Sequence, residues 1–382
     1  MDVRRAVPDR PNLVVTDAAV EASRLFSPYR LQVARQARGF TKSDLSKRLE
    51  MSAAALSQFE LGQNRPSPAS IERLSSVLNF SPSFFSTGTV LSTADQADDE
   101  VVDSYGHFRS LRSVSATRRR QVLTVAHLLR DVTAFLETHV KLPELDVPHH
   151  DAESPEDIAS VAAEVRAELG ADSAGPIEDV LRLLERRGIV CARYPMDAAD
   201  VSAFSVTMER RTFLVLKEQR EAKRDRDRFS SCHELGHLVM HQSGQALASK
   251  ALERQADIFA SEFLMPRESI RDELPSKVDW PRFLRLKQRW GVSMAALLYR
   301  SKSLDIMPET TYVQAVRTMN VRGWRKNEPG TVAAIEAPRL LSAAFSVTDF
   351  TEADVSAATG WPEDMVSELF AESTDARPSV QL

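Results

Sequence analysis

The sequence predicts a mostly α-helical chain of several domains with one small β-sheet. Three observations support this fold class. The chain has 382 residues, which is too many for one ordinary hydrophobic core. Segments rich in Ala, Leu, Arg and Glu dominate, and there are only 13 glycines and 7% aromatic residues. The stretches IVCARYP and FSVTMERRTFLVLK are apolar or alternating with a turn at MERR, so they predict two or three strands.

The composition argues against a membrane or secreted protein. No apolar run approaches the roughly 18 residues of a membrane-spanning helix. No apolar stretch follows Arg4 and Arg5, so a secretory signal is not expected. Two cysteines, Cys191 and Cys232, are too few for a disulfide framework. We therefore expect a cytoplasmic protein with no membrane partner.

Changes in the pattern along the chain predict five parts. A loose arm comes first, then a basic helical module, then an acidic linker with a connecting helix. A domain of helices and strands and a helical extension follow. In order, these parts cover residues 1–27, 28–88, 89–152, 153–300 and 301–382.

The chain after the predicted linker contains clear element boundaries. Ser154 caps a helix that runs to Glu168, and a second helix runs from Ile177 to Arg187. The strand at Thr212–Lys217 is a candidate free edge on which a substrate backbone could pair. Four tryptophans predict that the C-terminal part has its own packed helices: Trp280, Trp290, Trp324 and Trp361.

The basic module has the pattern of a helix-turn-helix. From Pro28 to Phe85 there are eight basic and four acidic residues, a net charge of +4 in a chain of −5. Thr41 and Ser52 cap two short helices, and Glu50–Met51 form a tight turn between them. The second of these helices is expected to lie in the major groove of DNA.

In GFTKSDLSKRL, SQFELG and RPSP this module resembles the phage-repressor (Xre-like) helix-turn-helix family. The resemblance implies binding to double-stranded DNA. The residues expected at the DNA are Lys42, Ser52, Ala53, Ala54, Ser57, Gln58 and Arg65. Lys42 is suited to binding a phosphate. Alanine can only contact a thymine methyl group, so we expect few direct contacts that distinguish the bases. A helical bundle used only for protein contact is the alternative interpretation.

The motif HELGH predicts a metal site. His233 and His237 are four residues apart, which on a helix means about 40° around the axis and about 6 Å along it. Two imidazoles at this spacing can bind one tetrahedral Zn²⁺, with Glu234 beside the water position as general base. The downstream helix LERQADIFASEFLMP offers Glu253 as third ligand, and Asp257 can accept a hydrogen bond from a ligating histidine.

Other residues compete for these roles. Glu262 is a rival to Glu253 as the third ligand. His241 continues the histidine stripe, but we expect it to support the site from outside or to lie on the surface. Cys232 is next to His233, yet neighbouring helical residues point about 100° apart, so we expect its thiol in the core.

HELGH followed by ERQADIFASEFLMP resembles the ImmA/IrrE metallopeptidase family, which is gluzincin-like. RDRFSSCHELGH, WGVSMAALLYR and GWRKNEP extend the resemblance, although Ala203 in DVSAF stands where relatives commonly have glycine. The resemblance implies an α+β zincin-like domain with a small sheet over 153–300. It also implies a zinc endopeptidase that cleaves a protein partner, expected to be a repressor, in a mobile-element, stress or defence circuit.

Two other functions remain open at this stage. The chain could be a transcriptional regulator or antitoxin whose zincin domain senses a ligand or docks a partner without turnover. It could also be a housekeeping peptidase with an incidental helix-turn-helix. The sequence contains every residue that hydrolysis requires, which favours the enzyme, whether active or latent. A homodimer is compatible with the sequence.

Overall fold

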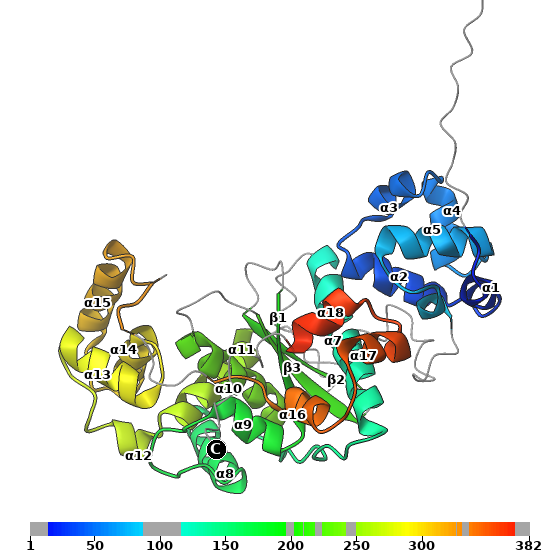
Figure 1. Cartoon of the computed structure of the whole chain (residues 1–382). Helices are drawn as coiled ribbons and strands as arrows, with labels where there is room; N and C mark the ends of the chain where they lie inside the picture. Colours follow the sequence, from blue (N-terminus) through cyan, green and yellow to red (C-terminus); the bar gives the residue numbers. More distant parts are fainter. Residues whose placement is uncertain are drawn as a thin grey trace, which may run out of the picture. The chain divides into compact units, whose positions relative to one another are not determined.

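The computed structural model describes residues 14–86, 116–195, 202–208, 210–217, 224–241, 250–325, 327–330 and 336–370. The chain divides into two units. Unit 1 combines Met1–Gln96 with Phe350–Val366, and unit 2 combines Ala97–Asp349 with Ser367–Leu382. Figure 1 shows many helices and one small sheet, which confirms the predicted fold class. The acidic stretch Ser92–Asp103, expected to be a linker, lies outside the described residues.

Unit 1 is a helical bundle. Its elements are α1 (Asp17–Arg24), α2 (Pro28–Ala37), α3 (Lys42–Arg48), α4 (Ala53–Glu60), α5 (Pro68–Leu78), the 3-10 helix η1 (Pro82–Phe85), α17 (Glu352–Thr359) and the start of α18 (Glu363–Phe370). The expected caps are confirmed, because Thr41 and Asp44 form a capping box on α3 and the Ser52 hydroxyl accepts a hydrogen bond within α4. Glu50 has a φ of 52°, which makes the tight turn of the helix-turn-helix.

The stretch 1–27, expected to be a loose arm, contains the short helix α1. Thr16 caps this helix, and Ala19 and Ala22 on it are fully buried. The Thr16 backbone N–H and hydroxyl both donate to the Glu72 carboxylate, at 2.9 and 2.6 Å. A helix of eight residues is not stable alone, so contacts with α5 and η1 decide that it forms. The sequence pattern of this stretch therefore gave little indication of a helix.

The C-terminal extension expected over 301–382 is divided between the two units. Trp361 belongs to unit 1, where it is 1% exposed, and its ring centroid lies 5.6 Å from that of Phe80 and 5.1 Å from that of Phe84. Arg38 on α2 donates two hydrogen bonds to the Asp364 carboxylate, at 2.9 and 3.2 Å. Trp361, which the sequence assigned to the packed helices of the C-terminal part, therefore completes the core of the N-terminal unit.

Unit 2 contains the sheet. Its strands are β1 (Ile189–Tyr194), β2 (Ala203–Met208) and β3 (Arg211–Lys217), in the order β1-β3-β2. β1 is parallel to β3, and β2 is antiparallel to it. β3 is thus central, and the prediction that Thr212–Lys217 is a free edge is wrong, because the earlier strand β1 pairs on its other side. Among the described residues, β2 and β1 are the outer strands.

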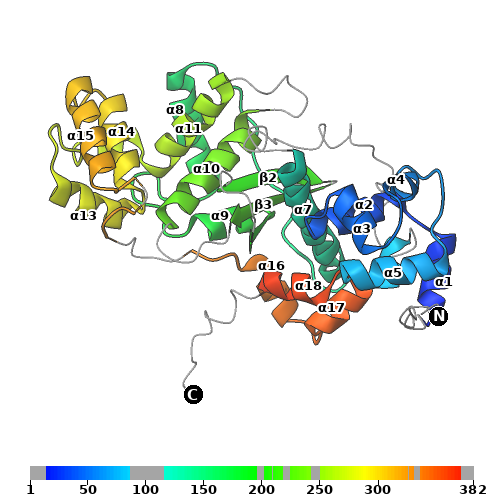
Figure 2. The same cartoon turned by 90° about the horizontal axis from the view of Figure 1, so that it is seen from above.

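Helices make up most of the rest of unit 2. They are α7 (Ala116–Glu137), α8 (Pro155–Glu168), α9 (Val180–Arg186), α10 (Arg224–Met240), α11 (Lys250–Leu264), α12 (Arg267–Ile270), α13 (Trp280–Trp290), α14 (Met294–Ser303), α15 (Glu309–Val321) and α16 (Leu340–Ser346). The predicted cap at Ser154 is confirmed, whereas α9 begins after Asp179 rather than at Ile177. α10 contacts β2 and β3, and α11 packs between α10 and α8 (Figure 2).

The described residues contain neither a helix that could span a membrane nor a disulfide. None of their helices is long and apolar enough to span a bilayer. Cys191 and Cys232 are both free and buried, and burial raises the pKa of both thiols.

Candidate metal centre and nucleic-acid interface

Two packed helices in unit 2 carry the candidate metal ligands. His233 and His237 lie on α10, and Glu253 lies in the first turn of α11. The two helices approach closely at Gly236, where an added Cβ would lie only 3.0 Å from the Phe259 ring. Glycine at this position of HELGH therefore lets α11 bring its carboxylate to the two histidines.

The three side chains form a compact set of donor atoms. The Nε2 atoms of His233 and His237 are 3.1 Å apart. The Glu253 carboxylate oxygens lie 3.3 Å from His233 Nε2 and 3.6 Å from His237 Nε2. A tetrahedral zinc site with bonds of about 2.0 Å has its ligand atoms about 3.3 Å apart. The three donors therefore fit one zinc ion and leave a fourth position for water.

A second group of residues orients the histidine rings. His233 Nδ1 lies 2.9 Å from Asp257 Oδ1, in the role predicted for Asp257. His237 Nδ1 lies 2.9 Å from Nδ1 of His241, whose Nε2 lies 3.0 Å from Gln255 Oε1. Contacts of this kind fix ring orientation in metal sites. His241 is 3% exposed, so of the two expectations for it, support of the site holds and surface exposure does not.

The electrostatics of the centre favour a positive charge. Burial lowers the pKa of His233, but hydrogen bonds with Asp257 and Glu253 outweigh burial and raise it to about 10. Carboxylates that stabilise a protonated imidazole also stabilise a bound cation. The charges around the three donor side chains therefore favour a bound cation, as the distances between their donor atoms do.

Glu234 is the residue of the motif that does not point at the other donors. Its Oε2 accepts hydrogen bonds from the Ser205 hydroxyl at 2.6 Å and from the Ser205 backbone N–H at 3.0 Å. Ser205 lies on the outer strand β2 and is fully buried. Burial raises the pKa of Glu234 to about 7, although the charge of His233 and the Ser205 bonds lower it. The carboxylate is thus fixed between the metal ligands and the sheet.

The competing residues have other partners. Both oxygens of Glu262 bind the guanidinium of Arg300, and both side chains are buried. Glu262 is therefore not the third ligand in this arrangement. Cys232 is fully buried and belongs to the hydrophobic core of unit 2, as its helical position predicts.

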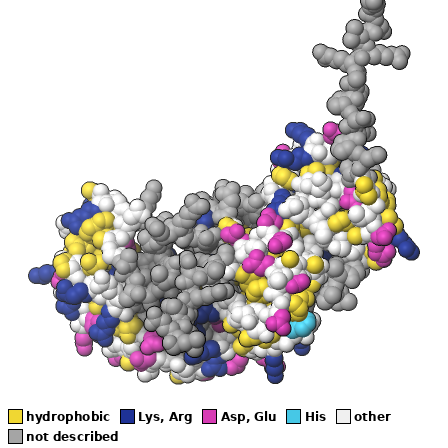
Figure 3. Space-filling view, viewed as in Figure 1, with side chains coloured by type: hydrophobic (Ala, Val, Ile, Leu, Met, Phe, Trp, Pro, Cys, Tyr) yellow, Lys and Arg dark blue, Asp and Glu magenta, His cyan; other side chains and the backbone are white. Residues whose placement is uncertain are grey.

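In unit 1, α3 and α4 carry the residues expected at DNA. Ser57 is partly buried and the others are exposed: Lys42, Ser52, Ala53, Ala54, Gln58 and Arg65. Figure 3 shows Lys and Arg side chains in dark blue on the part of the unit where α3 lies. The N-terminal turn of α4 is therefore open to solvent.

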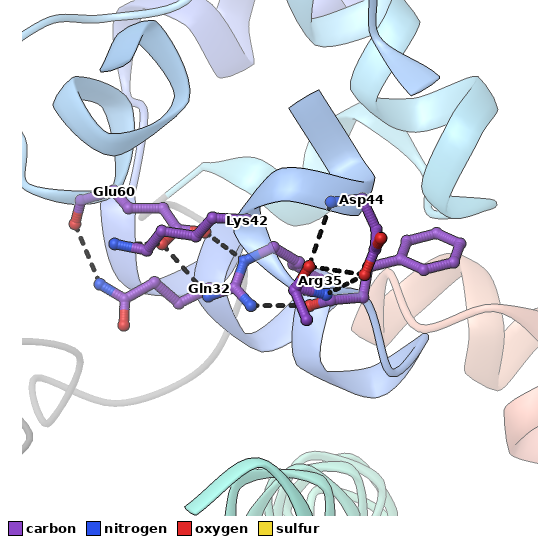
Figure 4. Close-up of polar contacts among 7 residues, drawn as sticks. Gln32, Arg35, Lys42, Asp44 and Glu60 are labelled. Carbon is purple, nitrogen blue, oxygen red and sulfur yellow. Dashed lines mark hydrogen bonds and ion pairs between the residues drawn. The ribbon is translucent and has the colours of Figure 1, made fainter. Parts of the chain in front are cut away.

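Behind this surface, Glu60 forms the centre of a polar cluster (Figure 4). Its buried carboxylate binds the Arg35 guanidinium at 2.5 and 3.2 Å and lies 3.2 Å from Lys42 Nζ. Its carbonyl accepts a hydrogen bond from Gln32 at 2.9 Å. Lys42 on α3 therefore forms an ion pair with Glu60 on α4, although its side chain is 45% exposed. This partner was not evident from the sequence.

Other candidate DNA contacts also have partners within unit 1. The Asn64 amide donates to Gln58 Oε1 at 2.7 Å. Arg65 donates to the Arg24 carbonyl at 3.0 Å, which caps the C-terminal end of α1. The Ser52 hydroxyl accepts its capping bond at 3.1 Å and keeps its own proton for donation.

Comparison with known families gives two matches. A family described as an IrrE N-terminal-like domain, of the M78 peptidases, matches residues 184–302, and a family described as helix-turn-helix matches residues 31–85. The chain thus joins a helix-turn-helix DNA-binding domain to an IrrE-like domain. No curated protein matches the chain.

The IrrE-like match runs from α9 to α14 and includes every residue of the candidate metal centre. The helix-turn-helix match runs from α2 to η1. Phe350–Val366, which completes unit 1, lies outside both matched ranges.

Sequence reasoning missed two residues of the IrrE-like domain that matter for the site. Ser205 contacts Glu234 from a strand about thirty positions away, and no spacing rule links it to HELGH. Gln255 lies two residues after Glu253, on a face that the (i, i+4) argument did not consider. Gly236, inside the motif, was a usable signal for close helix packing.

Proposed function

We propose that the protein is a DNA-binding regulator whose IrrE-like domain is a zinc-dependent endopeptidase acting on a protein partner, expected to be a repressor. The observation that carries this proposal is the donor triangle of His233, His237 and Glu253, with its sides of 3.1 to 3.6 Å, next to the fixed carboxylate of Glu234. A site that only stabilises a fold needs no buried carboxylate beside an open fourth position.

The mechanism assigns separate tasks to these residues. His233, His237 and Glu253 would hold a zinc ion, which when bound polarises the scissile carbonyl and lowers the pKa of water. Glu234 accepts the proton of the attacking water and passes it to the leaving amine. Ser205 keeps the Glu234 carboxylate in place by two hydrogen bonds. The outer strand β2, rather than β3, is our candidate for pairing with the substrate backbone.

Capture of the partner protein and its cleavage test the proposal. Glu234→Gln removes the base but leaves the shape of the site, so this variant should retain the partner protein that the wild type cuts. Positioned acid–base groups contribute ~10²–10⁴-fold in rate, and the loss in cleavage of the captured partner should fall in this range. Cleavage is measured by mass spectrometry of the captured partner after incubation with each form.

His237→Ala, which removes a metal ligand, is the control for the zinc requirement. A regulated reporter gene should stay locked in one state with either variant. Normal switching with Glu234→Gln, together with failure of His237→Ala, would instead support a sensor or docking domain that uses zinc without turnover.

For the DNA-binding unit, we propose that the first turn of α4 enters the major groove, with Ser52, Ala53, Ala54, Ser57 and Gln58 towards the bases. Ser52, Ala53 and Ala54 lie at the N-terminal end of α4, and Ser57 and Gln58 follow one turn later, which supports this. Lys42 and Arg65 would lie at the phosphates. Binding of the full chain to duplex DNA should weaken steeply with salt. Gln58→Ala should change the preference among sites, whereas Lys42→Ala should weaken all sites about equally.

A further inference from the structure

Unit 2 contains a cavity beside the candidate metal centre that none of the roles above uses. Its volume is about 430 Å³, and α10, α11 and α14 form its walls. These three helices lie near one another in both Figures 1 and 2. The side chains that define its character are Arg226, Phe229, Arg254, Asp257, Ala296 and Tyr299.

The cavity shares a wall with the metal ligands. Asp257, one of its lining residues, is the group that lies 2.9 Å from His233 Nδ1. Phe229, another lining residue, precedes His233 by four positions on α10, which is about one helical turn. The cavity therefore borders the His233 ring on its Nδ1 side, about one helical turn from the candidate ligands.

One side of the cavity is apolar. Phe229 and Ala296 are half-buried, and the Tyr299 side chain is 41% exposed, which is high for a large hydrophobic residue. Ligand pockets span about 300–1,000 Å³, so this cavity suits a single large side chain rather than a folded element. An exposed aromatic wall of this kind gains free energy when an apolar group covers it.

The other side of the cavity is cationic. Among the residues that the structure describes, no acidic side chain forms an ion pair with Arg226 or Arg254. Arg226 donates to the Arg325 carbonyl, and Arg254 is exposed on α11. The carboxylate of Asp257 is already engaged by His233. The remaining charge at the cavity is therefore positive, and it favours a carboxylate on the ligand.

We propose that this cavity selects the substrate of the IrrE-like domain: it binds a large apolar side chain of the peptide, while Arg226 and Arg254 bind an acidic residue beside it. The inference rests on the proposed peptidase function and specifies its substrate class. It makes Arg254 and Ala296 specificity-determining residues. Neither belongs to the candidate ligand set or to the contacts of Glu234.

The test uses the full chain with Glu234→Gln, which should bind peptide without cutting it. The probes are fluorescent synthetic octapeptides with Phe at one position, flanked by either Glu or Lys, and a third with Ala in place of Phe. The Phe–Glu peptide should bind at least about tenfold more tightly than each of the others, because Lys in place of Glu is repelled by the two arginines and Ala in place of Phe leaves the apolar wall uncovered. Fluorescence anisotropy gives the dissociation constants.

Three further substitutions in the same background separate the two sides of the cavity. Arg254→Glu should reverse the preference between Glu and Lys, and Ala296→Trp should fill the cavity and abolish the preference for Phe over Ala. Arg285→Glu, an exposed charge reversal on α13 outside the cavity, should leave all three constants unchanged. Circular dichroism and zinc content verify that each variant is folded.

Unchanged constants in both cavity variants, or no binding of any octapeptide, would overturn the cavity proposal. Failure of the peptidase proposal has a different signature. In that case the cavity variants shift binding as expected, but the chain with Glu234 intact cuts neither the octapeptides nor a captured partner.

Discussion

The helices α10 and α4 carry the candidate functional residues of the two units, and they are held in opposite ways. On α10, His237 and Glu234 are 1% and 3% exposed, and each has a partner from another element or turn. On α4, the candidate DNA contacts are exposed except for the partly buried Ser57, and the buried residues of this helix are Leu56 and Glu60. A metal centre needs fixed donors, whereas a DNA-reading helix needs accessible side chains on a rigid support.

Substitutions should therefore impair the two units in different ways. Damage to the contacts around α10 acts directly on the chemistry. Damage to unit 1 acts through the packing below α4, and part of that packing comes from the distant segment Phe350–Val366. The predictions below test the two modes, beginning with the largest effect.

Removing a candidate ligand should abolish metal binding. His237→Ala takes away a donor that lies 3.1 and 3.6 Å from the other two, so zinc should fall from about one ion per chain to almost none. Glu234→Gln should retain the ion, because Glu234 bonds to Ser205 and is not a ligand. Elemental analysis of the purified forms measures the ratio. Equal zinc in both variants would contradict the site.

Removing Trp361 should unfold unit 1 preferentially. A buried Trp replaced by Ala costs about 3–5 kcal/mol, and Trp361 packs on Phe80 and Phe84. In calorimetry, one of two unfolding transitions should fall and DNA binding should be lost with it. For the same reason, the fragment Met1–Thr89 should bind DNA poorly unless Phe350–Val366 is supplied.

The matched control is Trp324→Ala, which removes a tryptophan that packs on Trp280 in unit 2. It should lower the other transition and leave DNA binding intact. If both tryptophan variants lower the same transition, the two units are not independent in stability.

The two units should respond to pH in opposite directions. Burial raises the pKa of Glu185 in unit 2 to about 7, although N–H groups of Leu340 and Arg339 lower it. Between pH 4.5 and 7 the folded state binds more protons than the unfolded state, so the stability of unit 2 falls as pH rises through this window. Glu185→Gln should remove this loss, which is about 3 kcal/mol at most. Urea unfolding at pH 5 and pH 8 measures it.

In unit 1, the hydrogen bond from Arg38 lowers the pKa of Asp364 below 3.8. Its contribution is present at neutral pH and is lost as pH falls through the lowered pKa. Urea unfolding of unit 1 should therefore become easier as pH falls from 5 towards 2, and a transition that does not weaken over this range would contradict the assignment.

The smallest effect is expected from the cap of α4. Ser52→Ala removes the hydroxyl that accepts the Ala55 N–H at 3.1 Å, which costs about 1 kcal/mol. Ser57→Ala, one turn later on the same helix, removes no cap and should cost less than half as much. Urea unfolding compares the two, and equal losses would show that Ser52 does not act as a cap.

The net charge of the basic module overstates the positive charge that is available to DNA. Its +4 includes Arg30 and Arg35, which are 2% and 6% exposed, and Arg38, which binds Asp364. Arg35 is neutralised by Glu60 within the core. These three arginines are engaged within unit 1, so the exposed positive charge is carried by α3, the loop after α4 and Arg73 on α5.

The sequence by itself determined what depends on neighbours along the chain. The caps at Thr41, Ser52 and Ser154 and the left-handed turn at Glu50 are set by side chains within a few residues. The (i, i+4) spacing of His233 and His237 is fixed by helical geometry alone. Only the tertiary structure decided that β3 is central, that Ser205 fixes Glu234, and that Trp361 completes the N-terminal core. These contacts join segments about 20 to 280 residues apart, and the choice among such pairings depends on how whole elements pack rather than on any local pattern.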